Sequence, residues 1–194
     1  MKVTKAQAQA NRARIVETAS ALFRERGYDG VGIADLMAEA GFTHGGFYKH
    51  FGSKTDLMAE AATCGFAQTA AKAEGVGAKE FVDHYLSRAH RDTPGEGCTM
   101  AALCADAARQ PQAVKTAFAA GLENMLATLG SRSAGAEKGE PGGARAKRIE
   151  VIAQVIGAIV LSRACPDDSP LADEILEACR ASVPARLSSP SARS

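Results

Sequence analysis

The richest group of chemically capable side chains lies between residues 43 and 54, at the starts of two predicted helices. Thr43 is suited to cap the first helix, and His44, Gly45 and Gly46 fill its first turn. Glycine destabilises a helix interior by about 1 kcal/mol relative to alanine, so two in succession require a compensating role. Because they lack side chains, the backbone can approach a flat surface closely, and the major groove of DNA is the natural candidate.

The residues that follow supply polar groups for the same surface. Tyr48 and Lys49 fall on the polar side of this helix, and Lys54 begins the next helix, where a cation and backbone N–H groups together favour a phosphate. His44 is compatible with a DNA contact and equally with a solvated position, and His50 with a phosphate contact or a capping role. The residues predicted to bind DNA are therefore Thr43, His44, Gly45, Gly46, Tyr48, Lys49, His50 and Lys54.

A second candidate, Cys98, begins another predicted helix. The helix dipole and free N–H groups stabilise a thiolate at such a position, and His90 and Arg91 lie nearby in the sequence. The pattern predicts a thiol that responds to oxidants or electrophiles, whereas a small residue satisfying a tight turn explains the cysteine as simply. A metal site built from Cys98, His84 and His90 matches no zinc spacing, so neither a metal nor a cofactor is expected.

Composition narrows the classes of function. No Ser-His-Asp arrangement, carboxylate pair or phosphate-binding glycine loop is visible, so we do not expect an enzyme. The 194 residues include five cysteines at irregular spacings, without a Cys-x-x-Cys pair. The chain has no secretory signal and no apolar run of about 18 residues. These features predict a protein of the reducing cytoplasm that does not enter the membrane.

Positive charge is not abundant where DNA would bind. The whole chain has a net charge of +1, and residues 1–58 contain eight Lys or Arg against six Asp or Glu. Phosphate contacts must therefore depend on the placement of a few side chains rather than on excess charge.

The elements that position these residues are all predicted helices, and the pattern predicts no strand and no repeat. Residues Asn11–Arg26 form the first helix, and Gly27 ends it. Ile33–Ala40 and Thr43–His50 are short helices separated by a sharp turn at Gly41. Further helices are predicted at 53–73, 78–91, 98–109, 112–131, 146–164 and 171–182, with a loop at 133–143. The sequence thus predicts an all-α fold.

Residues 12–60 resemble the DNA-binding domain of the TetR/AcrR (tetracycline-repressor) family. The resemblance is carried by Ala40–Leu57, in which Tyr48, Phe51 and Lys54 stand in register, and by Ala21–Tyr28 upstream. It implies that Tyr48 contacts a phosphate and that His50 occupies the family's usual histidine position. Phe47 and Phe51 are expected to face the core. The chain departs from the family where Val31 and Gly32 replace the usual Ser or Thr, and where Phe42 replaces a smaller aliphatic residue.

The resemblance also implies a domain organisation. We expect a helix-turn-helix DNA-binding domain at 1–52, a helical effector-binding and dimerisation domain at 53–183, and a disordered tail at 184–194. The last two long helices would pair two copies, because Ile149, Ile156 and Val160 widen the apolar surface of one of them; the alternative is a helix wholly buried in one subunit. The helices at 78–91, 98–109 and 112–131 would surround a ligand.

The function implied is that of a sequence-specific transcriptional regulator. We expect a repressor that binds a palindromic operator in double-stranded DNA as a homodimer and is released by an unknown small-molecule effector. The alternative is a thiol-based redox or electrophile sensor on the same scaffold, in which Cys98 receives the signal. Residues 97–103 resemble a Gly-Cys-x-x-Ala-Ala-Leu run found in a subset of these regulators.

Overall fold

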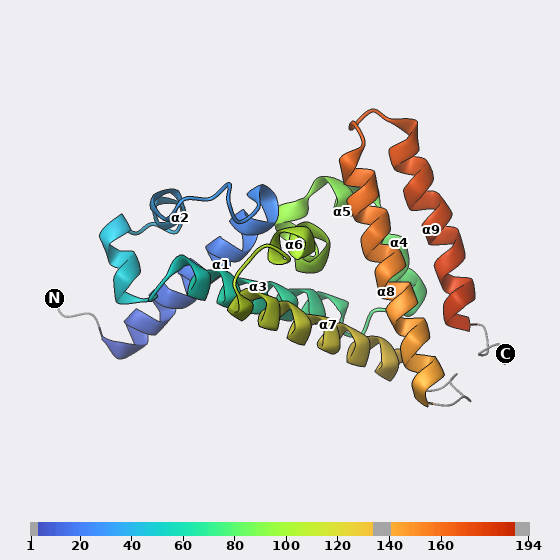
Figure 1. Ribbon diagram of the computed structural model, residues 1–194, viewed down its shortest axis with the longest axis horizontal. Helices are drawn as coiled ribbons and strands as arrows, with labels where there is room; N and C mark the ends of the chain where they lie inside the picture. The colour runs from blue at the N-terminus through green and yellow to red at the C-terminus, as the bar shows by residue number, and fades with distance from the viewer. Residues whose placement is uncertain (1–3, 134–140, 189–194) are drawn as a thin grey trace. The chain divides into compact units, whose positions relative to one another are not determined.

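A computed structural model of the chain describes residues 4–133 and 141–188, and every element in these ranges is a helix (Figure 1). The predicted all-α fold is confirmed. The elements are α1 (Lys5–Arg26), α2 (Ile33–Glu39), the 3₁₀ helix η1 (His44–Lys49), α3 (Lys54–Ala73), α4 (Ala78–Tyr85), α5 (Arg88–Asp92), the 3₁₀ helix η2 (Pro94–Glu96), α6 (Thr99–Ala107), α7 (Gln112–Ser133), α8 (Pro141–Ala164) and α9 (Pro170–Ser188). In this described part, no helix combines the length and the hydropathy that crossing a membrane requires.

The chain divides into two compact units. Unit 1 comprises Met1–Thr69 with Pro94–Gly121, and unit 2 comprises Ala70–Thr93 with Leu122–Ser194. The sequence placed a functional boundary between residues 52 and 53, which differs from this division because α6 and the start of α7 belong to the unit that contains α1 and α2. The functional division stays a prediction.

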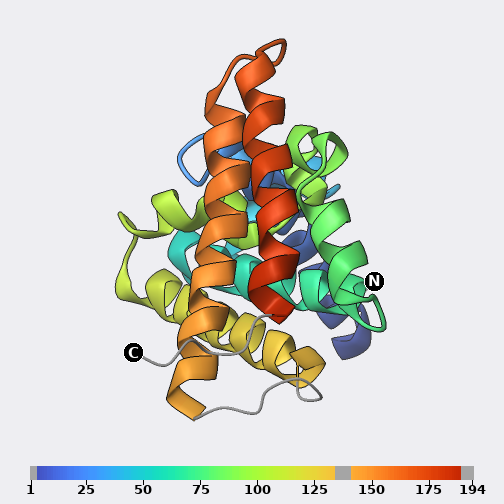
Figure 2. The same cartoon turned by 90° about the vertical axis from the view of Figure 1, so that its right-hand side faces the viewer.

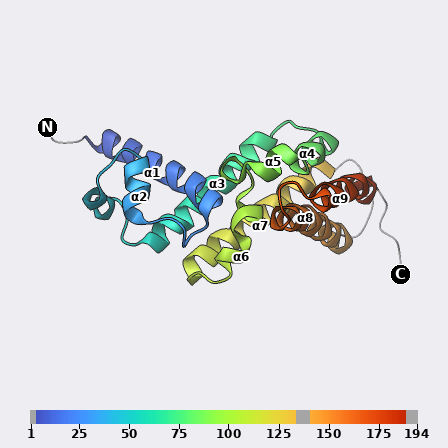
Figure 3. The same cartoon turned by 90° about the horizontal axis from the view of Figure 1, so that it is seen from above.

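Unit 1 is built around α1. Thr4 caps this helix by accepting a hydrogen bond from the Gln7 backbone N–H at 3.2 Å, so the helix begins six residues earlier than predicted. Gly27, with φ at 73°, ends it as expected. The fully buried side chains of Ile15 and Phe23 face the core, and α2 lies beside α1 (Figures 1 and 3).

The helix predicted at 78–91 is two helices, α4 and α5. Leu86 leaves the helical conformation with ψ at 41°, and the Ser87 hydroxyl accepts a hydrogen bond from the His90 backbone N–H at 3.2 Å. A serine side chain offers the backbone this alternative to a continuous helix. The periodicity of the apolar residues continues through the break, which is why the sequence did not predict it.

Two of the predicted irregular segments are partly helical. Pro141–Gly143, predicted as the end of a loop, form the first turn of α8, where proline is favoured because its missing N–H is not needed. Residues 184–188, predicted as part of a disordered tail, continue α9. Residues 134–140 of the predicted loop and 189–194 of the predicted tail lie outside the described residues.

Unit 2 is dominated by α8 and α9, which lie side by side and are joined by a short turn (Figures 1 and 2). Ile152 and Ile159 of α8 are buried, as are Leu176 and Val183 of α9. Spacings of seven residues place each pair on one helical face. The two helices therefore share an apolar seam along most of their length.

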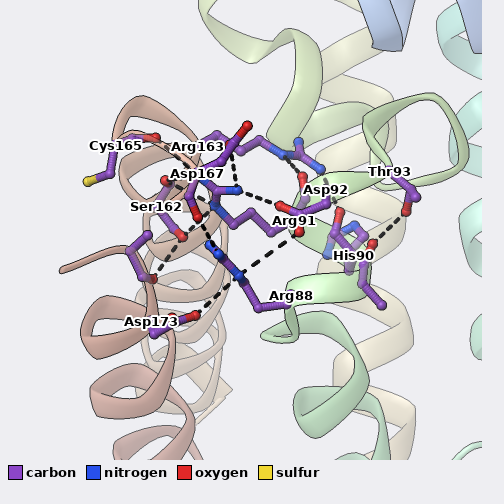
Figure 4. Close-up of polar contacts among 12 residues, drawn as sticks. Arg88, His90, Arg91, Asp92, Thr93, Ser162, Arg163, Cys165, Asp167 and Asp173 are labelled. Carbon is purple, nitrogen blue, oxygen red and sulfur yellow. Dashed lines mark hydrogen bonds and ion pairs between the residues drawn. The ribbon is translucent and has the colours of Figure 1, made fainter. Parts of the chain in front are cut away.

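Helices α5 and α8 exchange arginines that cap each other's ends (Figure 4). The buried Arg91 of α5 donates to the carbonyls of Ser162 and Cys165 at 3.1 Å each. Arg163 of α8 donates in return to the carbonyls of Arg91 and His90 at 2.8 Å each. Carbonyls at a helix C-terminus lack partners within the helix, so this exchange satisfies both ends and fixes α5 to α8.

His90 is a buried titratable group beside this exchange. Its Nδ1 donates a hydrogen bond to the Tyr85 carbonyl at 2.7 Å. Burial lowers the pKa of His90 below its ordinary value, and the charges of Arg163, His84 and Lys72 lower it further, whereas the Tyr85 carbonyl acts in the opposite direction. The folded protein therefore favours the neutral imidazole.

We predict that His90 accounts for part of the loss of stability in acid. Below about pH 6.5, the ordinary histidine pKa, the unfolded chain binds a proton at His90 that the folded chain does not, so the free energy of unfolding decreases. His90→Asn keeps a donor near the Nδ1 position and removes the titration. Between about pH 7.5 and about pH 5.5, urea unfolding should show a smaller loss for the variant, by at most about 1.4 kcal/mol. His44→Asn is the control, and equal losses in wild type and His90→Asn would contradict the prediction.

Candidate nucleic-acid interface

Two short helices and a tight turn form the candidate interface in unit 1. Helix α2 follows Gly32, which provides no side-chain cap, as the sequence suggested. Gly41 has φ at 78°, and its N–H donates to the Ala38 carbonyl at 2.9 Å, while the Phe42 N–H donates to the Met37 carbonyl at 2.7 Å. This pair of hydrogen bonds ends α2 in a Schellman motif. The chain can then turn sharply into η1.

The element predicted as a third helix, Thr43–His50, is the 3₁₀ helix η1. The Gly46 N–H donates to the Thr43 carbonyl and the His50 N–H to the Phe47 carbonyl, each at 2.9 Å and each three residues back. Thr43 stands at the N-cap position, but its side chain forms no capping hydrogen bond. Two glycines in a six-residue segment disfavour a regular α-helix, and short 3₁₀ turns are common in such places.

The inner side of this element is aromatic. Phe47 is fully buried and Phe51 is 4 % exposed, and their ring centroids are 5.4 Å apart. Both were predicted as core residues, and both are. Phe47 anchors η1 to the core of unit 1, and Phe51 anchors the segment that follows η1.

The outer side carries most of the predicted DNA-binding residues. Thr43, His44, Gly45, Tyr48 and Lys49 are exposed. Tyr48 is exposed over 66 % of its surface, and its ring meets the ring of His44 edge-on at 6.4 Å. Gly46 and His50 are half-buried. These seven residues thus lie along one continuous segment. At its first turn, the side chains of Thr43 and His44 are exposed to a ligand.

The two glycines of this segment are not required by the fold. Neither Gly45 nor Gly46 has a positive φ. A Cβ on Gly45 would meet nothing within 4 Å, and one on Gly46 would stand 3.6 Å from Met37, an ordinary contact. Alanine would therefore fit at both positions.

Lys54, the eighth predicted residue, is engaged within the protein. Its ammonium donates to the Tyr28 carbonyl at 2.6 Å, and the Tyr28 N–H donates to the Asp106 carboxylate of α6 at 3.2 Å. The sequence did not suggest a role for Asp106, because 78 residues separate it from Tyr28. An ammonium has three N–H donors, so a phosphate contact by Lys54 stays a prediction.

Comparison with known proteins finds a family that matches the part of the chain containing this candidate interface. The family of "Bacterial regulatory proteins, tetR family" matches residues 15–61, which contain α2, η1 and their turn. The regulator TtgR of Pseudomonas putida is 42 % identical over 55 residues, which are 28 % of this chain. Residues 15–61 therefore form a DNA-binding segment of the TetR type. The matched part covers only about a quarter (26 %) of the length of TtgR.

Solved TetR-type structures share the fold over nearly the whole chain. The reduced form of NemR from E. coli is 19 % identical, with a TM-score of 0.72 over 90 % of this chain and 95 % of NemR. AibR in complex with isovaleryl coenzyme A and operator DNA is 16 % identical, with a TM-score of 0.59 over 89 % of this chain and 97 % of AibR. At these identities the likeness establishes the TetR-type fold, with an N-terminal helix-turn-helix domain and a helical C-terminal domain.

Cys98, the other candidate site, stands at the N-cap position of α6 and is 2 % exposed. The sequence associated it with His90 and Arg91, but the hydrogen bonds of both described above are made within unit 2. The five cysteines lie within the described residues and form no disulfide there. Among the same residues, no group of three or more His, Cys, Asp or Glu side chains is arranged to hold a metal ion.

Arg24 of unit 1 is a buried cation that sequence reasoning missed. It is 7 % exposed, and it donates to the Gly95 carbonyl at 2.9 Å and to the Ser20 hydroxyl at 2.7 Å. Burial lowers the pKa of Arg24, and the nearby sulfurs of Cys64 and Cys98 act in the opposite direction. Within residues 4–133 and 141–188 no carboxylate forms an ion pair with it. Arg24 is thus a charge near Cys98 that belongs to the same unit.

Proposed function

We propose that this chain is a sequence-specific DNA-binding transcriptional regulator that reads bases with the first turn of η1. The observation that carries the proposal is the pair of glycines in the first turn of η1, Gly45 exposed and Gly46 half-buried, which the fold does not require. A bare backbone there allows close approach to base edges, while Tyr48, Lys49 and His50 are available for phosphates. TtgR is itself a transcriptional regulator, and AibR was solved on operator DNA.

We propose further that two copies pair through α8 and α9 and bind a palindromic operator. Ile149, Ala153 and Val160 of α8 are exposed, and their spacings of four and seven residues place them on one helical face, apart from the buried Ile152 and Ile159. An exposed apolar stripe of this kind is typical of a helix that pairs. A dimer would present two copies of η1 to half-sites one helical turn apart, about 34–36 Å.

Substitution of the stripe should separate the subunits. Val160→Glu would bury an unpaired charge in the proposed interface, which costs several kcal/mol, so we expect the dimer dissociation constant to rise at least about tenfold. Leu122→Glu of α7 is a matched control, because Leu122 and Val160 are each 37 % exposed. Light scattering on a sizing column measures both masses. A monomeric wild type, or equal effects of the two substitutions, would contradict pairing through α8.

The regulator we propose is a repressor that a small molecule releases from DNA. Within unit 1, α6 bonds to the segments that flank the interface, through Asp106 to Tyr28, which also binds Lys54. A ligand that displaced α6 would therefore disturb the first turn of α3, directly after η1. Release requires that the ligand bind more tightly to the conformation with low DNA affinity. AibR was solved with both isovaleryl coenzyme A and operator DNA, so a protein of this fold can bind a small molecule as well as DNA.

DNA binding and the role of Gly45 can be tested together. A duplex selected from a random pool by the wild-type protein serves as the probe, and a scrambled duplex as the reference. Gly45→Ala should weaken binding of the selected duplex about tenfold or more, near 1.4 kcal/mol, because a methyl group enters the contact surface. Its free energy of unfolding should stay the same or rise by up to about 1 kcal/mol. Fluorescence anisotropy and urea unfolding measure the two effects.

The possible results distinguish the proposed DNA binding from the proposed close approach of DNA at Gly45. Gly77→Ala is the control, since a Cβ there also meets nothing within 4 Å and Gly77 precedes α4 in the other unit. If the wild type prefers no duplex over scrambled DNA, the proposed function is wrong. If it does, and Gly45→Ala binds as tightly as wild type, only the close approach at Gly45 is wrong.

A second candidate function is a thiol-based sensor, favoured by the buried charge of Arg24 near Cys98. NemR, a structural neighbour, was solved in a form described as reduced. The Cys98 thiolate would take an oxygen atom from hydrogen peroxide, giving a sulfenic acid and releasing hydroxide. Oxygen added to a side chain that is 2 % exposed would displace the start of α6.

Cys98→Ser should then remove the response to peroxide and leave DNA binding intact. We expect peroxide to weaken wild-type binding of the selected duplex at least about tenfold, with less than a twofold change in the variant. Cys104→Ser, on the same helix and more exposed, is the matched control and should respond as wild type does. An unchanged response in Cys98→Ser would remove this cysteine from the mechanism.

A further inference from the structure

The recognition element η1 cannot hold its orientation by itself. It has six residues, two of them glycine, and no side-chain cap at Thr43. A 3₁₀ helix has poorer hydrogen-bond geometry than an α-helix and rarely persists beyond one or two turns. Its orientation must therefore be set by contacts from outside, and Phe47 and Phe51 supply only the inner ones.

Arg12 of α1 makes two contacts with the residues that follow η1, and a third with α3. Its Nε donates to the His50 carbonyl at 3.3 Å. Its guanidinium lies over the Phe51 ring, 4.7 Å from the centroid. Glu60 of α3 holds the same guanidinium from the other side, accepting from Nη1 at 2.6 Å and also from Nη2. The hydrogen bond to Glu60 raises the pKa of Arg12, in agreement with a positive charge that a neighbouring carboxylate compensates.

Arg14, one helical half-turn further along α1, contacts the other end of the recognition element. Its guanidinium lies 4.4 Å from the centroid of Phe42, the residue directly before Thr43. A cation over an aromatic ring at an exposed site contributes about 0.5–1 kcal/mol. The recognition element is thus bracketed by two arginines of one helix, of which Arg12 has the more extensive contacts.

We propose that Arg12 is a positioning residue for DNA recognition, which acts through His50 and Phe51 and depends on Glu60 rather than on a phosphate. The proposal rests on the proposed DNA-binding function. A planar guanidinium that forms two parallel hydrogen bonds to a carboxylate is fixed in direction. In this direction the Arg12 Nε donates its hydrogen bond to the carbonyl of His50, the residue directly after η1. Lysine cannot reproduce this arrangement, because its ammonium is a point charge without the fork.

Glu60 makes the proposal sharply testable, since the two possible roles of Arg12 predict opposite effects. If Arg12 bound a phosphate, Glu60→Gln would free the guanidinium and remove a negative charge, so DNA binding would strengthen. If Arg12 positions η1, Glu60→Gln loosens the guanidinium and DNA binding weakens. Glutamine has nearly the shape of glutamate, so this variant also guards against a loss of folding.

The experiment measures anisotropy of the selected duplex and of a scrambled duplex at several salt concentrations. The variants are Arg12→Lys, Glu60→Gln and the double variant. We expect each single variant to lose about tenfold in affinity for the selected duplex, and the double variant to lose little more, because the two residues act as one unit. Affinity for scrambled DNA and the salt slope should stay near the wild-type values, whereas loss of a phosphate contact lowers the slope by about one.

A matched pair provides the control. Arg145 and Glu123 of unit 2 form the same two-point ion pair, at 3.0 and 2.6 Å. Arg145→Lys and Glu123→Gln should leave the preference for the selected duplex unchanged. A general loss of folded protein would reduce the active fraction for both duplexes equally and would leave their affinity ratio unchanged, whereas a positioning role changes the ratio.

The proposal is overturned if Glu60→Gln binds the selected duplex as tightly as wild type or more tightly. It is also overturned if Arg12→Lys lowers the salt slope by about one or leaves the affinity ratio unchanged. A wild-type protein that shows no preference for any duplex overturns the proposed function itself, which is a different result.

Discussion

The recognition element is too short and too rich in glycine to fold alone, and the surrounding structure compensates for this. Its inner aromatic residues, Phe47 and Phe51, are buried, so its depth in unit 1 is fixed by packing. The turn at Gly41 fixes the direction from which the chain enters, because the Gly41 and Phe42 N–H groups each donate a hydrogen bond back to α2. Helix α1 supplies the remaining contacts, through Arg12 to His50 and Phe51 and through Arg14 to Phe42. A segment with little helical preference can thus present a defined surface.

The same constraint explains which residues are available for a ligand. The proposed close approach to DNA requires small residues at the centre of the surface, and glycine stabilises a helix poorly. The stabilising contacts therefore lie at the ends and on the inner side of η1, at Phe42, His50 and Phe51. The exposed first turn keeps only Thr43, His44 and the glycines, and it contributes little to the core.

The sequence predicted local features well and long-range polar contacts poorly. The spacing of apolar residues and the positions of glycines predicted the helices and the turn at Gly41. The i, i+4 spacing of Phe47 and Phe51 predicted that both are buried. The break at Leu86 was missed because apolar periodicity runs through it. The contacts of Arg12 with Glu60 and of Tyr28 with Asp106 span 48 and 78 residues. No local pattern marks such partners, so only the fold reveals them.

The placement of cations also explains how a chain proposed to bind DNA can have nearly balanced charge. With 23 Lys or Arg and 22 Asp or Glu, the chain has no general positive field. Several of its cations instead satisfy backbone carbonyls that helices and turns leave without partners. These are Arg12 on His50, Arg24 on Gly95, Lys54 on Tyr28, Arg91 on Ser162 and Arg163 on His90. A count of charges therefore overestimates the number that can meet phosphates. In the proposed function, affinity for DNA then depends on the few exposed groups of η1 and on how rigidly its two ends are held.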